Sequence, residues 1–190
     1  GKFFKVLLEF HPMDTQTLQK RIDDSLDVLI PLFGVEDLKK FKEPTIRREL
    51  RKDEHPGFPR ECPAYYALKN YFYWPPKNAF DWGIDIFGVQ TVNHEVSHYI
   101  HHSVNPSMNQ GLIQCEETGK RPAGHKAFCE MVAEYANFIL GLNADLKPWQ
   151  QEVVKDAKRI YEKYGADFLP KLARISLDEA IESNIIILNI

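Results

Sequence analysis

NHEVSHYIHH, residues 93–102, is the stretch on which the interpretation of this chain depends. His94, Glu95 and His98 have the spacing HExxH. On a helix, residues four apart lie on one face about 5–6 Å from each other, so two imidazoles can bind one zinc ion. Glu95 is turned about 100° from His94, beside an open coordination position, where it can accept a proton from a metal-activated water. The spacing predicts a catalytic metal site.

The context of the motif favours a packed helix rather than a solvated one rich in histidine. Residues 88–104 are predicted to be helical, with an apolar face of four residues: Val89, Val92, Val96 and Tyr99. A histidine face on such a helix is an unfavourable surface to bury without a metal. His101 and His102 lie one turn further on and are expected to be solvated or to support the ligands.

The composition predicts a globular protein of one domain, residues 1–190. Hydrophobic residues make up 44% and charged residues 27% of the chain, which suits a packed core. The net charge of −3 favours neither a nucleic acid nor an anionic membrane as partner. Three cysteines without a CxxC pair favour a reducing, cytoplasmic compartment, and no apolar run approaches the ~20 residues of a membrane span.

The fold class is predicted as α+β, with an N-terminal extension over residues 1–60. This part contains a strand at 3–10 and a helix at 14–34, capped by Asp14 and ended by Gly34. The charged, proline-rich stretch 43–63 is expected to be mostly loop. The aromatic stretch that follows, residues 64–76, ends in two prolines and is predicted to be an edge strand.

The strand at 64–76 and the HExxH helix form the middle part of the predicted domain, residues 64–104. A long loop is expected over 105–124, and residues 125–190 are predicted to be mostly helical. That part comprises helices at 125–143 and about 147–164, two short helices, and the uncharged run NIIILNI at 184–190. We expect this run to pair with the N-terminal strand or to be buried in an interface.

A catalytic zinc needs a third protein ligand. The metzincin pattern is excluded, because the positions of its glycine and third histidine hold His101 and Val104. The remaining candidates are four downstream acids: Glu116, Glu117, Glu130 and Glu134. The last two share one face of the predicted helix at 125–143. Two acids on a packed helix are costly unless a positive group satisfies them, although a solvated acidic face is the simpler alternative.

These residues, HEVSH at 94–98 and CEMVAEY at 129–135, resemble the gluzincins, zincin-like metallopeptidases with HExxH on one helix and a ligand glutamate on a later one. The resemblance implies Zn²⁺ bound by His94, His98 and Glu130, with Glu134 accepting a hydrogen bond from His94. Residues 64–74 are similar to the edge strand that lies over the active-site helix in this fold. The large aminopeptidases have their ligand at an offset closer to Glu117, so Glu117 remains an alternative.

The resemblance also implies the reaction, hydrolysis of a peptide bond with Glu95 as general base and a peptide or protein as substrate. Members of the family place a tyrosine or histidine near the oxyanion. Tyr161 lies in a segment, RIYEKYGADF, that resembles the corresponding one, and we expect it to take this role. The other candidates for the donor are Tyr164, Tyr135 and His125.

A different class of function is a regulatory or partner-binding module of the antitoxin or stress-regulator type, in which an HExxH domain has restricted or no general proteolytic activity. Such proteins normally carry a DNA-binding helix-turn-helix. The predicted helix at 14–34 is acidic, which makes a poor recognition helix. Glu95 is not needed for metal binding alone, so its presence favours the peptidase.

Overall fold

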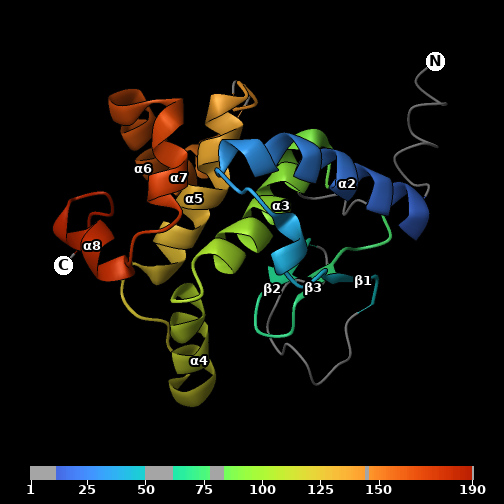
Figure 1. Ribbon diagram of the computed structural model, residues 1–190, viewed down its shortest axis with the longest axis horizontal. Coiled ribbons are helices and arrows are strands. Elements are labelled where there is room, and N and C mark those ends of the chain that lie inside the picture. Colours follow the sequence, from blue (N-terminus) through green and yellow to red (C-terminus); the bar gives the residue numbers. More distant parts are fainter. Residues whose placement is uncertain (1–11, 50–61, 78–83, 144–145, 190) are drawn as a thin grey trace.

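The computed structural model describes residues 12–49, 62–77, 84–143 and 146–189. It confirms a mixed α+β architecture, in which a small three-stranded sheet lies at one side of a mostly helical molecule (Figure 1). The strand predicted at 3–10 lies outside the described residues.

The sheet consists of β1 (Thr45–Arg47), β2 (Ala64–Tyr66) and β3 (Tyr71–Tyr73), in the order β1-β3-β2. β1 is parallel to β3, and β2 is antiparallel to it. The single strand predicted over 64–76 is therefore wrong, because the chain reverses at Asn70, which has a φ of 53°. The loop predicted over 43–63 contains β1. β2 lies at an edge of the sheet, but β3, the strand next to the two prolines from which the edge position was predicted, is the central strand.

Helix α2 (Thr15–Leu32) confirms the prediction for residues 14–34. The Asp14 side chain accepts a hydrogen bond of 2.7 Å from the Thr17 backbone N–H, and Gly34 follows the helix with a φ of 67°. Its apolar side packs against α3 (Val89–Val104), the predicted HExxH helix. A buried hydrogen bond of 2.6 Å from Ser25 Oγ to Asn93 Oδ1 fixes α2 beside the first histidine of the motif.

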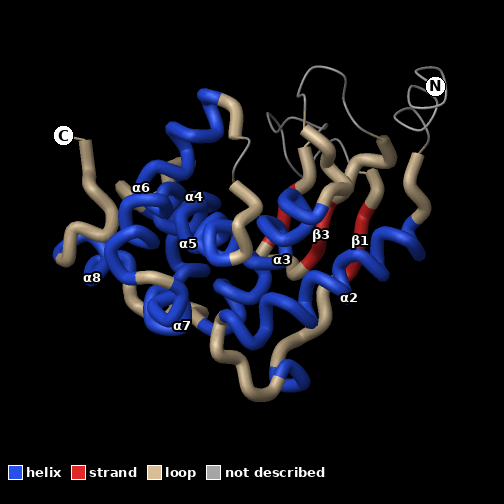
Figure 2. Tube along the Cα trace, turned by 90° about the horizontal axis from the view of Figure 1, so that it is seen from above, coloured by secondary structure: helices blue, strands red, loops and turns tan. Residues whose placement is uncertain are grey.

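The centre of the molecule is the pair formed by α3 and α5 (His125–Ile139). Figure 2 shows α3 between the sheet and α5. The two helices run in opposite directions, since Asn137 near the end of α5 donates a hydrogen bond of 3.1 Å to the Gln90 carbonyl at the start of α3. This antiparallel contact brings the middle of the HExxH motif opposite the middle of α5.

The long loop predicted over 105–124 is wrong, because Met108–Thr118 forms helix α4. Pro106 and Gly111 favoured a loop, but the proline precedes the helix. Gly111 lies inside it, where a Cβ atom would be only 2.3 Å from the His125 ring. The glycine therefore allows α4 to pack closely on α5, rather than ending the helix.

The C-terminal part is helical, as predicted. It contains α6 (Pro148–Tyr164), the 3-10 helix η2 (Ala166–Phe168), α7 (Leu169–Leu172) and α8 (Leu177–Glu182), and a further 3-10 turn, η1 (Leu38–Lys40), follows α2. Ile185 and Ile186 in the final run are buried in the core, whereas Ile187 is 55% exposed. Residues 184–189 form no strand, and the expected partner at 3–10 lies outside the described residues, so this pairing stays a prediction.

His101 lies in the core, contrary to the expectation that it is solvated or supports the ligands. Its side chain is fully buried beside Phe128, with the two ring centroids 5.5 Å apart, and neither ring nitrogen has a hydrogen-bond partner among the described residues. Burial lowers the pKa of His101 well below its usual value. The folded protein therefore holds this imidazole in its neutral form.

We predict that His101→Leu raises the free energy of unfolding at pH 7 by about 1 kcal/mol, because an unpartnered polar ring leaves the core. Below about pH 6.5 the unfolded wild-type chain takes up a proton that the folded protein excludes. The advantage of the variant should then grow by up to about 1.4 kcal/mol per pH unit. Urea unfolding at several pH values measures both effects.

His125→Leu is the matched control for that measurement. His125 is also buried, but its ring makes hydrogen bonds to Arg121 and to the Met108 carbonyl. Its replacement should lower stability, because two polar partners are left unsatisfied. A loss of stability at pH 7 in His101→Leu would show that the buried imidazole makes a favourable contact of its own.

Candidate metal centre

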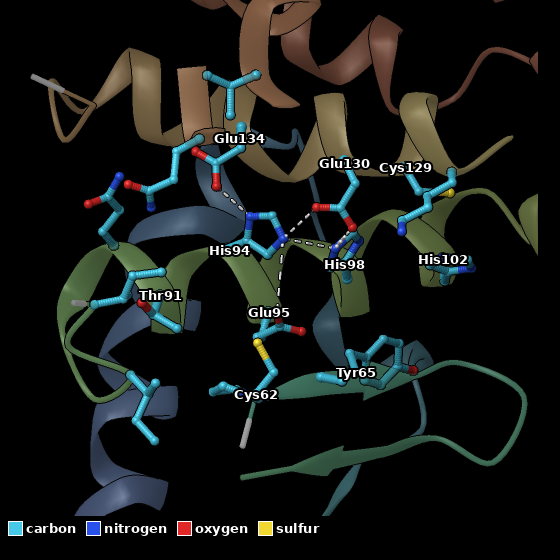
Figure 3. A pocket seen from close by; sticks show the side chains of 18 of the residues that line it. Cys62, Tyr65, Thr91, His94, Glu95, His98, His102, Cys129, Glu130 and Glu134 are labelled. Carbon is cyan, nitrogen blue, oxygen red and sulfur yellow. Dashed lines mark hydrogen bonds and ion pairs between the residues drawn. The ribbon is translucent and has the colours of Figure 1, made fainter. Parts of the chain in front are cut away.

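Two helices bring together the three side chains of the candidate metal site. His94 and His98 project from one face of α3, and Glu130 projects toward them from α5 (Figure 3). The Nε2 atoms of the two histidines are 3.1 Å apart. The Glu130 carboxylate oxygens lie 3.0 Å from Nε2 of His94 and 3.2 Å from Nε2 of His98. The structure thus places the ligand set implied by the resemblance in one cluster.

The geometry of this cluster fits a tetrahedral metal ion. An ion bound at about 2.0–2.1 Å from each donor sets neighbouring donors about 3.3–3.4 Å apart. The histidine nitrogens are 3.1 Å apart, and they lie 3.0 and 3.2 Å from different oxygens of the Glu130 carboxylate, so all four atoms are close to this spacing. Two imidazoles and one carboxylate suit zinc and also other divalent transition metals. The three residues could therefore hold a divalent metal ion, and a tetrahedral ion bound by them would have a fourth coordination position free.

Glu134 fixes the orientation of His94, one turn beyond Glu130 on α5. Its carboxylate accepts a hydrogen bond from Nδ1 of His94 and a second, of 2.9 Å, from the Asn143 side-chain amide. With the proton on Nδ1, the lone pair of Nε2 is directed at the metal position. Burial lowers the pKa of His94, but the charges of Glu130 and Glu134 outweigh it and raise this pKa well above its usual value.

Glu95 lies on the open side of the ligand group. Its carboxylate is 3.9 Å from Nε2 of His94 and points into a cleft between α3 and β2 (Figure 3). Burial raises the pKa of Glu95, although the neighbouring charges of His94 and His98 oppose this effect. A carboxyl group with a raised pKa beside an open coordination position is suited to proton transfer.

The cleft has a volume of about 650 Å³ and is lined by residues of five elements. The ligand helices α3 and α5 form its base, β2 forms one side, the first turns of α6 form one end, and Leu112 of α4 lies at the other. The side chains that line it include Cys62, Ala64, Tyr65, Gln90, Thr91, Leu112, Cys129, Leu146, Gln150 and Val154. A cleft of this volume can hold several residues of an extended peptide.

Other residues considered from the sequence lie elsewhere. Glu116 and Glu117 are exposed on α4 and do not belong to the ligand group. The ring of Tyr161 packs against Tyr135 and Phe138, with centroids 5.6 and 6.0 Å away. None of the four candidate oxyanion donors lines the cleft; they are Tyr161, Tyr164, Tyr135 and His125.

Arg121 and Lys126 line the cleft and were not considered from the sequence, and His102, which was expected to be solvated or to support the ligands, lines it as well. His102 lies four residues beyond His98, so the helical spacing could have placed it on the ligand face. It is buried, makes a hydrogen bond of 2.9 Å with Asn109, and has its pKa lowered by burial to about 4. His102 is therefore an uncharged side chain in the wall of the cleft. Arg121 lies in the connection between α4 and α5 and Lys126 in the first turn of α5, and only tertiary packing brings both to the cleft.

We predict that the protein, purified without added metal, contains about one divalent metal ion per chain. Glu130→Ala should remove most of this metal, because it leaves only two imidazole ligands. Glu117→Ala is the control and should keep the metal content of the wild type. Elemental analysis measures the metal content of the wild type and the two variants. Loss of metal from Glu117→Ala alone would show that the third ligand is misassigned.

A second prediction concerns Glu134. Glu134→Ala should keep all three ligands but weaken metal affinity by about 10–100-fold, because Nδ1 of His94 loses the acceptor that orients the ring. Competition with a chromophoric chelator measures the affinity. An unchanged affinity would show that packing alone orients His94.

Comparison with known protein families, with curated proteins and with solved structures found no match. In the described part of the chain, no helix combines the length and the apolar character needed to cross a bilayer. The functional interpretation therefore depends on the chemistry of the His94, His98 and Glu130 group and the cleft beside it.

Proposed function

We propose that this protein is a zinc-dependent peptidase with a zincin-like fold and the ligand arrangement of the gluzincins. The observation that carries the proposal is the position of Glu95. A carboxylate beside the fourth coordination position of a His-His-Glu group is needed for hydrolysis but not for binding a structural ion. A site that served only stability would close this position with a fourth ligand.

The ligand group suits Zn²⁺, which would be held by His94, His98 and Glu130. A bound zinc ion supplies a Lewis acid for the substrate carbonyl and lowers the pKa of a water molecule. Glu95 accepts the proton of the attacking water and delivers it to the leaving nitrogen. Glu134 keeps His94 in the tautomer that presents Nε2 to the ion. Each of these roles follows from a contact or an orientation described above.

The position of β2 supports a peptide as substrate. β2 is at the edge of the sheet, and its residues Ala64 and Tyr65 line the cleft opposite the ligand group. An edge strand can pair through its backbone with an extended peptide, which would then pass across the metal position. Backbone pairing recognises the extended conformation of a substrate more than its side chains. The substrate of the proposed enzyme is accordingly a peptide or an extended segment of a protein.

We predict that Glu95→Gln retains the metal and loses peptide hydrolysis by a factor of at least about 100, because the amide cannot accept the proton. Release of fragments from a mixture of unstructured peptides, followed by mass spectrometry, measures the activity. Glu117→Gln removes an acid outside the cleft and should keep full activity. If Glu95→Gln cuts as fast as wild type, this assignment of the general base is wrong.

A further inference from the structure

The α4 end of the cleft carries two cations, Arg121 and Lys126. The three carboxylates that line the cleft, Glu95, Glu130 and Glu134, all surround the histidines of the ligand group instead. Within the described residues, Arg121 forms no ion pair with a carboxylate. The cleft is thus acidic at its centre, where an ion would balance the charge, and basic at one end.

Arg121 is held in place by a fixed hydrogen-bond network. Its Nε–H donates to Nδ1 of His125 over 2.9 Å, and Nε2 of His125 lies 2.8 Å from the Met108 carbonyl. Because Nδ1 is an acceptor and the carbonyl needs a donor, His125 is neutral, with its proton on Nε2. The imidazole is itself only 2% exposed and packs against Gly111. The Arg121 side chain is therefore held in position by a hydrogen bond to a buried residue.

This arrangement leaves the end of the guanidinium group available. The hydrogen bond to His125 uses one of the five N–H donors of an arginine. The group also lies near the thiol of Cys129, which directly precedes the ligand Glu130. The planar fork of a guanidinium matches a carboxylate through two parallel hydrogen bonds. Arg121 thus presents a preorganised site for a carboxylate in the part of the cleft beside Cys129, the residue that precedes the ligand Glu130.

We propose that Arg121, assisted by Lys126, binds a carboxylate of the substrate at the α4 end of the cleft. This inference rests on the proposed peptidase function and deepens it, because it specifies the charge of the substrate next to the bond that is cut. The carboxylate has two sources in a peptide, its C-terminus or the side chain of an aspartate or glutamate. The first source makes the enzyme a carboxypeptidase, and the second makes it an endopeptidase that prefers acidic residues.

The test uses binding, so that it does not depend on hydrolysis. Zinc-loaded Glu95→Gln protein is immobilised and exposed to three pools of synthetic hexapeptides with acetylated N-termini. One pool has a free C-terminal carboxylate and no acidic residues, the second has an amidated C-terminus and one glutamate, and the third has an amidated C-terminus and glutamine in place of glutamate. Mass spectrometry quantifies the retained peptides. We expect one of the first two pools to be retained about tenfold better than the third.

The same measurement with Arg121→Gln added should abolish this preference. Lys120→Gln is the matched control, since it removes one positive charge from an exposed neighbour that does not line the cleft. Arg121→Lys should restore part of the preference, because it returns the charge without the fork. Metal content and melting temperature equal to those of the parent protein show that each variant is folded. Lys126→Gln replaces Arg121→Gln in the comparison if the latter is not folded.

The outcomes separate the two proposals. A preference for carboxylates that depends on Arg121, together with no cleavage by the wild-type protein, would retain the subsite and reject the peptidase. Cleavage by the wild type without a carboxylate preference would retain the peptidase and overturn the subsite. Equal retention of all three pools also overturns the subsite, because no carboxylate is then recognised. A preference that survives both Arg121→Gln and Lys126→Gln overturns it as well, because the carboxylate would then be bound by the metal.

Discussion

The contact on which this structure depends is the meeting of two imidazoles from α3 with a carboxylate from α5, at separations of 3.0–3.2 Å. Three polar groups this close, on helices whose other faces are buried in the core, are unfavourable without a positive charge between them. A divalent ion removes this penalty and at the same time fixes the register of the two helices. Metal binding and the stability of the α3–α5 pair are therefore expected to be linked.

The other elements are arranged around the α3–α5 pair and shape the cleft beside it. The sheet covers one side of α3 and directs β2 toward the cleft, while α2 holds the back of α3 through the hydrogen bond between Ser25 and Asn93. α4 and α6 close the two ends of the cleft. The result is a cleft with the candidate metal ligands at its centre, Glu95 on one side and a basic group at one end.

The sequence predicted the centre of the site better than its surroundings, for a physical reason. His94, Glu95, His98 and Glu134 are fixed by helical periodicity within two continuous helices, which is a local property of the sequence. The choice of Glu130 over Glu117 needed the antiparallel pairing of α3 and α5. Arg121 and the misplaced Tyr161 depend on tertiary packing. The loop predicted over 105–124 contains α4, in which Gly111 permits a close contact with a ring from another helix that no local pattern records.

The hydrogen bond from Asn143 to Glu134 gives the site an influence beyond its two helices. Asn143 belongs to the connection that leads from α5 into α6, and the first turns of α6 carry cleft residues such as Gln150 and Val154. The position of the Glu134 carboxylate, and with it the orientation of the His94 ring, therefore depends in part on a residue that follows α5 rather than on the two ligand helices alone.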